Sequence, residues 1–152
     1  SQIMGNTEAF EPITSNIYTR KTLAGDFIVV NKFLMDELID MGLWNEAIKD
    51  TIIANNGSIQ SISQIPQDIK DRYKTVWELK QRVLIDQSAD RAPFICQSQS
   101  LNLYFSKPQF NKIHSALMYA YTRGLKTMSY YTRTQAMSEA VAFTVNCESC
   151  SG

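Results

Sequence analysis

Two cysteines near the end of the sequence are the residues best suited to redox chemistry. Cys147 and Cys150 are separated by two residues, a spacing at which two thiols can form a small-ring disulfide and exchange it with another. A zinc site would need two further ligands, but the single histidine, His114, and the third cysteine, Cys96, are distant in sequence. A thioredoxin-type centre should open a helix, and no helical segment follows this pair. An exposed dithiol that carries reducing equivalents and an incidental pair of tail cysteines remain as alternatives; Cys96 is assigned no role.

Two adjacent tyrosines, Tyr130 and Tyr131, are the second candidate. A neutral phenol has a pKa of about 10 and a transferable proton, although adjacent tyrosines are usually packing residues. On a regular strand, neighbouring side chains point to opposite faces of the sheet. The two rings can therefore stack only where a strand ends or bends, and we predict that regular strand geometry stops at or before Tyr130.

Charge and hydropathy argue against two classes of partner. Fifteen basic and fifteen acidic residues give a formal net charge of zero over 152 residues, and the basic residues form no run. We therefore expect no capture of nucleic acid or of an anionic membrane surface. The apolar runs are too short to span a bilayer. Three cysteines without a secretory signal indicate reduced thiols and a cytoplasmic location.

The first half of the sequence predicts a short extended region followed by three helices. Residues 13–23 can be extended, 24–26 form a turn, and 27–30 are a short apolar run. One helix is expected from Asn31 to Gly42 and a second from Asn45 to the breaker at Asn55–Gly57. The clearest helix is expected over residues 68–89. The inward stripes of these helices are predicted to contain Leu34, Leu38, Ile39, Met41, Ile48, Ile52, Ile53, Ile69, Tyr73, Val76, Trp77, Val83 and Leu84.

The second half predicts strands that alternate with helices. A buried strand is expected at residues 101–105, a helix from Pro108 to Gly124, and a strand at residues 125–131. The inner face of that helix is predicted to contain Phe110, Ile113, Leu117, Ala120 and Tyr121. Residues 140–145 are a candidate for one more strand. This is the βαβ pattern of an α/β protein with a parallel sheet. Because residues 1–90 offer no partner strands, the chain is expected to complete a sheet that lies elsewhere.

Six stretches, taken together and in order, resemble a known enzyme family. They lie at residues 5–12 (GNTEAFEP), 14–20, 56–60, 73–78, 97–102 and 124–134 (GLKTMSYYTRT). They resemble the C-terminal part of the catalytic (alpha, large) subunit of class I, aerobic ribonucleoside-diphosphate reductase, in its eukaryotic and T4-like phage branch. The resemblance covers essentially the whole chain, and it is specific because no single short motif carries it.

The resemblance implies a fold and a division of the chain. The family's fold is a ten-stranded α/β barrel, to which this chain would contribute the last strands and helices and would be incomplete alone. Residues 1–145 would belong to the barrel domain and residues 146–152 would form a redox-active cysteine tail. The missing sheet partners would then lie in the N-terminal portion of the large subunit.

The resemblance also implies roles for the candidate residues in the reduction of ribonucleoside diphosphates to deoxyribonucleotides. Tyr130 and Tyr131 match the adjacent tyrosines that relay a radical from the small subunit to the thiyl-forming cysteine. Cys147 and Cys150 match the tail dithiol that re-reduces the active-site disulfide and is itself reduced by thioredoxin or glutaredoxin.

The same resemblance implies that other parts of the machinery lie outside this chain. No cofactor is expected in it; the di-iron centre and tyrosyl radical belong to the small (beta) subunit, and nucleotide effectors bind the N-terminal portion of the large subunit. The expected partners are therefore that N-terminal portion, the small subunit, and thioredoxin or glutaredoxin. The compartment would be the host cytoplasm if a phage encodes the chain.

Several alternatives remain open at the level of sequence. The chain can be one piece of a split subunit, a segment that follows an intein, or a cut fragment of an ordinary subunit. Its function can also be non-enzymatic, as a barrel remnant that binds the small subunit or thioredoxin. A stand-alone dithiol redox protein is the third class, and the lack of a helix behind Cys150 argues against it.

Overall fold

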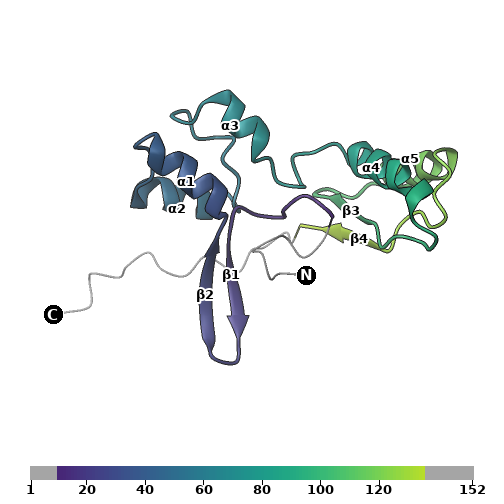
Figure 1. Cartoon of the computed structure of the whole chain (residues 1–152), viewed down its shortest axis with the longest axis horizontal. Helices are drawn as coiled ribbons and strands as arrows, with labels where there is room; N and C mark the ends of the chain where they lie inside the picture. The colour runs from purple at the N-terminus through teal and green to yellow at the C-terminus, as the bar shows by residue number, and fades with distance from the viewer. Residues whose placement is uncertain (1–9, 136–152) are drawn as a thin grey trace.

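The computed structural model describes residues 10–135, whose helices and strands form two groups (Figure 1). A hairpin and three helices form the first group, between residues 17 and 72. The second group lies between residues 81 and 134 and contains the remaining helices and strands. Within the described residues, no helix has both the length and the apolar character that crossing a membrane requires.

The hairpin projects away from the helices of its own group (Figure 1). Its strands, β1 (Ile17–Thr22) and β2 (Gly25–Val30), pair antiparallel with Thr22 opposite Gly25. The Ala24 N–H donates to Thr22 Oγ1 at 3.2 Å, and Gly25 adopts a φ of +133°, which favours glycine. The predicted extended region and apolar run are therefore confirmed, but the turn lies at Leu23 and Ala24, and Gly25 and Asp26, predicted to be in the turn, begin β2.

Three short helices follow the hairpin. They are α1 (Lys32–Asp40), α2 (Glu46–Ala54) and α3 (Gln67–Arg72). The start of α2 is confirmed, because Asn45 Oδ1 accepts a hydrogen bond from the Ile48 N–H at 2.9 Å. Gly42 follows α1 with a φ of +67°, the left-handed conformation expected of a residue that ends a helix.

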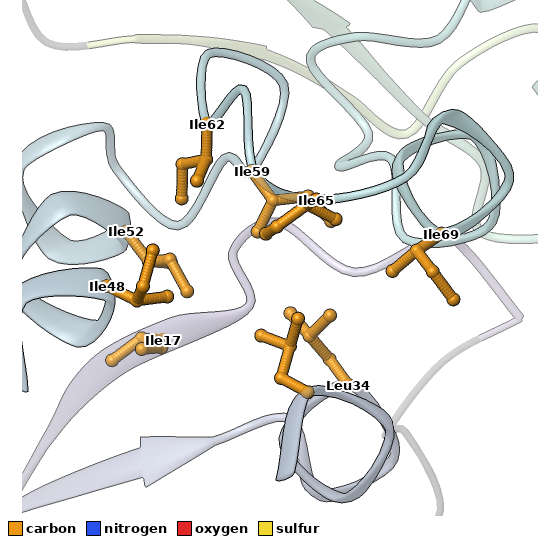
Figure 2. Close-up of a cluster of buried hydrophobic side chains, with 9 residues drawn as sticks. Ile17, Leu34, Ile48, Ile52, Ile59, Ile62, Ile65 and Ile69 are labelled. Carbon is orange, nitrogen blue, oxygen red and sulfur yellow. The ribbon is translucent and has the colours of Figure 1, made fainter. Parts of the chain in front are cut away.

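The first hydrophobic core lies where these helices, the base of β1 and the loop between α2 and α3 converge (Figure 2). Its buried members are Ile17, Leu34, Leu38, Ile48, Ile52, Ile59, Ile62, Ile65 and Ile69. Two residues predicted to face inward from α1, Ile39 and Met41, are exposed instead. They lie at the edge of the stripe, where no other described element covers them.

The single long helix predicted over residues 68–89 is wrong. The chain forms α3 and then α4 (Gln81–Arg91), with turns between them. Tertiary hydrogen bonds replace helical ones at this break: the Val76 N–H donates to Ile13 O at 2.8 Å and Asn16 Nδ2 donates to Tyr73 O at 3.0 Å. The apolar stripe predicted for this single helix is consequently divided between the two hydrophobic cores, because Ile69 belongs to the first and Val76 to the second.

The second group contains a parallel βαβ unit, as predicted. Its elements after α4 are η1 (Ala92–Phe94), β3 (Asn102–Phe105), α5 (Phe110–Thr122) and β4 (Tyr131–Thr134). β3 and β4 pair in parallel, with Asn102 opposite Tyr131 and Tyr104 opposite Arg133. The α/β class is confirmed, and among the described residues neither two-stranded sheet closes.

The position of the last strand was predicted wrongly. β4 begins at Tyr131, where the predicted strand over residues 125–131 was to end. The segment after Gly124 is held in irregular conformation by side-chain bonds: Lys126 Nζ donates to Ile95 O at 2.8 Å and to Cys96 O at 2.9 Å. Regular pairing with β3 therefore starts only beyond this segment.

The faces of the helices in this group also differ in part from the prediction. Val83 is exposed, and Ile85 is buried in its place. Pro108 precedes α5 rather than lying in its first turn. Phe110 and Tyr121 of α5 are exposed, because a two-stranded sheet is too narrow to cover a helix of 13 residues. The second core comprises Val76, Leu84, Ile85, Leu101, Leu103, Tyr104 and Ala120.

Candidate functional site

The start of β4 positions the two adjacent tyrosines. The Tyr130 N–H donates to Leu101 O at 2.7 Å, and Tyr131 is the first residue in register with β3. The Ser129 hydroxyl donates to Tyr131 O at 3.2 Å, which also constrains the junction. The backbone of the pair is therefore fixed against β3, although neither side chain is buried.

The rings of Tyr130 and Tyr131 contact each other edge to face. Their centroids are 4.3 Å apart and their planes are inclined at 66°, a favourable geometry for aromatic pairs. The rings are in contact at a strand end, the one place where adjacent side chains of a strand can meet, but the prediction that regular strand geometry stops at or before Tyr130 is wrong. Regular geometry begins at Tyr131 rather than stopping before it, so the rings meet where the strand starts. The side chains are 63% and 51% exposed, respectively.

Arg133 lies beside the pair, at a position for which the sequence indicated no role. Its guanidinium carbon is 5.4 Å from the centroid of the Tyr131 ring, within the range of a cation–π contact. Residues two apart on a strand share a face, so the spacing of Tyr131 and Arg133 could have indicated this contact once the strand was correctly placed.

A buried tyrosine that bonds a partly exposed carboxylate adjoins the same face, and the sequence did not predict this pair. Tyr104 of β3 donates its hydroxyl hydrogen to Glu11 Oε2 at 2.8 Å. Burial raises the pKa of Tyr104 to about 12, and the hydrogen bond and negative charge of Glu11 act in the same direction, partly opposed by the charge of Arg133. Glu11 lies 93 residues before Tyr104, and no local sequence pattern links two such distant positions.

The remaining sequence candidates lie apart from the tyrosines or outside the described residues. Cys147, Cys150, the tail at 146–152 and the candidate strand at 140–145 lie outside residues 10–135. Cys96 is exposed. His114 is exposed on α5, as expected for a surface histidine, and its ring stacks on Phe110 with centroids 5.9 Å apart.

This arrangement is suited to one-electron chemistry. Two phenols in direct ring contact allow an electron to pass between them, and their exposed hydroxyl groups can exchange a proton with solvent or with a partner surface. Transfer of an electron together with a proton leaves each tyrosine neutral, which avoids the cost of an isolated charge once the site is covered.

Comparison with known proteins assigns the family. The model of the ribonucleotide reductase barrel domain matches residues 1–131. The "Ribonucleoside-diphosphate reductase large subunit" of Plasmodium falciparum is 58% identical over 146 residues, and its Arabidopsis thaliana counterpart is 52% identical over the same length. Each match covers 96% of this chain and 18% of the relative.

A solved structure agrees with this assignment. The chain resembles the Actinobacillus ureae class Id ribonucleotide reductase alpha subunit with a TM-score of 0.71 and 30% identity, over 83% of this chain and 22% of that one. The two-stranded parallel sheet described above is thus part of a barrel, which explains why it is open. The chain belongs to the ribonucleotide reductase large-subunit family and spans about a fifth of the length of the relatives it matches.

Proposed function

We propose that this chain is the C-terminal part of the large subunit of a ribonucleoside-diphosphate reductase, and that Tyr130 and Tyr131 relay a radical within it. The observation that carries the proposal is the 4.3 Å ring contact between adjacent tyrosines at the start of a barrel strand, in a chain of this family. The reaction served is the reduction of ribonucleoside diphosphates to deoxyribonucleotides.

The relay conserves both charge and protons. A neutral phenoxyl radical on Tyr131 takes one electron and one proton to become a phenol, while Tyr130 loses one electron and one proton to become the next radical. Edge-to-face contact supplies the electronic path, and Arg133 holds the Tyr131 ring by its cation–π contact.

The relay requires partners, because its donor and acceptor lie on other segments. All four residues of β4 are exposed, whereas parallel sheets are normally covered on both faces. The N-terminal portion of the large subunit would supply the neighbouring barrel strands, the thiyl-forming cysteine and the sites for nucleotide effectors. The small subunit would supply the initiating tyrosyl radical from its di-iron centre. Assembly would take place in the cytoplasm, and the chain alone would be inactive.

The tail carries the second part of the proposal. Cys147 and Cys150 would form the dithiol that reduces the active-site disulfide and is itself regenerated by thioredoxin or glutaredoxin. The support is their spacing of two intervening residues, which suits thiol–disulfide exchange. Residues 1–145 would thus serve the barrel and 146–152 the reductant.

The relay is tested by removing one phenolic hydroxyl at a time. Tyr130→Phe or Tyr131→Phe should reduce turnover of the assembled reductase to background, because phenylalanine cannot lose a proton and an electron at accessible potential. Tyr121→Phe, which alters another exposed tyrosine on α5, is the matched control and should retain turnover. Assembly is measured in parallel by analytical ultracentrifugation. Normal turnover in either relay variant would rule out the role.

The same experiment separates the proposal from a non-enzymatic interaction module. A module would bind the small subunit or thioredoxin, yet its complex with the N-terminal portion would show no reductase activity even before mutation. Deoxyribonucleotide formation by the unmutated assembly therefore decides between the two functions.

The tail dithiol is tested by a choice of reductant. Cys147→Ser should block turnover driven by thioredoxin but spare turnover driven by a small dithiol that enters the active site directly. Cys96→Ser is the matched control, because Cys96 is exposed and is assigned no role. An equal loss with both reductants in the Cys147 variant would contradict a shuttle.

A further inference from the structure

Tyr104 lies in the second core, and the carboxylate of Glu11 beside it can accept the proton of its hydroxyl group. Only 6% of its surface is exposed, and its hydroxyl hydrogen is directed to Glu11 Oε2 at 2.8 Å. Its ring and the Trp77 ring are arranged edge to face, with centroids 5.2 Å apart and planes at 90°. Tyr104 and Trp77 are thus two readily oxidised side chains in contact, one of them bonded to a carboxylate.

Glu11 is held in place to receive that proton. Its Oε1 accepts the Asn102 N–H at 2.8 Å, and its Oε2 accepts Asn102 Nδ2 at 3.1 Å in addition to the Tyr104 hydroxyl. These bonds fix the carboxylate against β3, on the same segment as the tyrosine. The acceptor therefore needs no rearrangement before proton transfer.

The register of the parallel sheet connects this pair to the relay. Tyr131 is opposite Asn102, and Tyr104 is two residues further along β3, opposite Arg133. Paired residues and residues two apart share a face, so Tyr104, Tyr131 and Arg133 lie on one side of the sheet. Strand spacing and rise place the Cα atoms of Tyr104 and Tyr131 about 8 Å apart.

We propose that Tyr104, with Glu11 as its proton acceptor and Trp77 behind it, is an oxidisable side branch of the radical relay; this rests on the proposed relay through Tyr131. The oxidant is the neutral Tyr131 radical. Tyr131 gains one electron and takes one proton from the partner surface that covers it or from solvent, so its O–H bond forms. Tyr104 loses one electron, its O–H bond breaks, and the proton passes to Glu11 Oε2. Return of the electron to Tyr104 reverses each change.

The charges around Tyr104 favour this coupled transfer over loss of an electron alone. Arg133 lies opposite Tyr104, and its positive charge acts on the phenol. A radical cation next to a guanidinium in a buried site would be costly. Release of the proton to Glu11 keeps Tyr104 neutral, and the protonated carboxyl can donate a hydrogen bond back to the phenoxyl oxygen. The branch thereby allows the oxidised state (the hole) to move reversibly onto Tyr104 when the relay cannot transfer it to the next residue.

The chain contains a matched pair in a different place. Tyr119 of α5 donates to Asp86 Oδ1 of α4 at 2.6 Å, so it has the same phenol–carboxylate chemistry as Tyr104. Tyr119 lies on a helix and not in the β3–β4 register, and the guanidinium of Arg82 covers its ring, with the guanidinium carbon 4.7 Å from the ring centroid. If the β3–β4 register defines the side branch, Tyr104 should be oxidised and Tyr119 should not.

The test is to place 3-aminotyrosine, which is easier to oxidise and traps a hole, at position 104, 119 or 131 of the fully assembled reductase. Electron paramagnetic resonance is recorded after mixing with substrate. We expect an aminotyrosyl radical at positions 131 and 104 and none at position 119. A radical at 131 but not at 104 overturns the branch and leaves the relay standing.

The other outcomes also decide. A radical at neither 131 nor 104 overturns the relay and the branch together. A radical at 104 alone overturns the branch, because Tyr104 would then lie on a main path that does not pass through Tyr131. A radical at 119 as well would show unselective trapping and overturn the assignment.

The proton acceptor is tested in the same complex. Glu11→Gln should lower the radical yield at position 104 severalfold, because the amide can accept a hydrogen bond but not the proton. Asp86→Asn, the matched change at the control pair, should leave that yield unchanged. An undiminished yield in the Glu11 variant would overturn the role of Glu11.

Discussion

At the residue scale, a buried asparagine ties the first group of elements together. Asn16 is fully buried, and its Nδ2 donates to Gly57 O at 2.8 Å and to Tyr73 O at 3.0 Å. Asn31 Nδ2 completes the network by donating to Asn16 Oδ1 at 3.0 Å. Gly57 lies close to Asn16 in this network. A side chain at position 57 would displace the backbone to which Asn16 is hydrogen-bonded.

Two glycines with left-handed backbones allow this close approach to be tested. Gly42→Ala should cost about 1 kcal/mol, because Gly42 has a φ of +67° but open space around it. Gly57 has a φ of +81°, and an added Cβ would meet Ser15 Oγ and lie 2.6 Å from the Asn16 nitrogen. Gly57→Ala should therefore cost about 1–3 kcal/mol more. Urea denaturation of the chain measures both values, and equal losses would contradict the packing argument.

At the element scale, α4 and α5 are joined by a carboxylate that three side chains surround. Asp86 accepts the Tyr119 hydroxyl at 2.6 Å and pairs with Arg123 Nε at 3.0 Å and Arg82 Nε at 3.4 Å. The hydrogen bond from Tyr119 lowers the pKa of Asp86, with the charges of Arg123 and Arg82 acting in the same direction against partial burial. Asp86 thus orients the helix that precedes the tyrosine pair.

The lowered pKa of Asp86 gives a pH-dependent contribution to stability. Because the folded pKa lies below the unfolded value of about 3.9, the contribution is present above that value and is lost as the pH falls through the folded pKa. The difference in urea midpoint between wild type and Asp86→Asn should be largest near neutrality and shrink below a pH of about 4.

A neighbouring carboxylate supplies the control for Asp86. Asp90 is more exposed and has only a 3.5 Å contact with Arg123 Nη2. Asp90→Asn should therefore change the midpoint little at any pH, as is usual for exposed pairs. A difference for Asp86→Asn that does not vary with pH would refute the electrostatic account.

At the scale of the whole molecule, the two groups differ in how complete they are. The first has its own core of nine buried residues. The second presents a parallel strand pair in which every residue of β4 is exposed. The segment around Glu11 and Ile13 bonds to residues of the second core, since Ile13 O accepts the Val76 N–H and Glu11 accepts the Tyr104 hydroxyl.

Assembly should therefore protect the second group selectively. In a peptide covering residues 130–135, the amide hydrogens that are not bonded to β3 should exchange rapidly in the chain alone and become slow when the N-terminal portion of the subunit is added, because new barrel strands would cover β4. Peptides from α1 and α2 are the control and should change little. Hydrogen–deuterium exchange mass spectrometry measures both, and unchanged exchange at residues 130–135 would contradict completion of the barrel by that portion.

The sequence by itself determined the elements whose signals are local. The helices α1 and α2, the cap at Asn45, the left-handed Gly42 and the βαβ order all follow from neighbouring residues, and the structure confirms them, although Ile39 and Met41 lie outside the buried face. Strand geometry also indicated that the adjacent tyrosines can meet only at a strand end, and their rings are in contact at the start of β4.

Only the tertiary structure decided the features that join distant segments. The break after α3 arises because Ile13 and Asn16 take part in hydrogen bonds with residues 73 and 76 that a continuous helix would have engaged itself. The segment before β4 is joined to Ile95 and Cys96 by the hydrogen bonds of Lys126. The Glu11–Tyr104 pair beside the relay joins positions 93 residues apart. Such contacts are determined by the packing of distant segments, and the local periodicity of apolar residues cannot predict them.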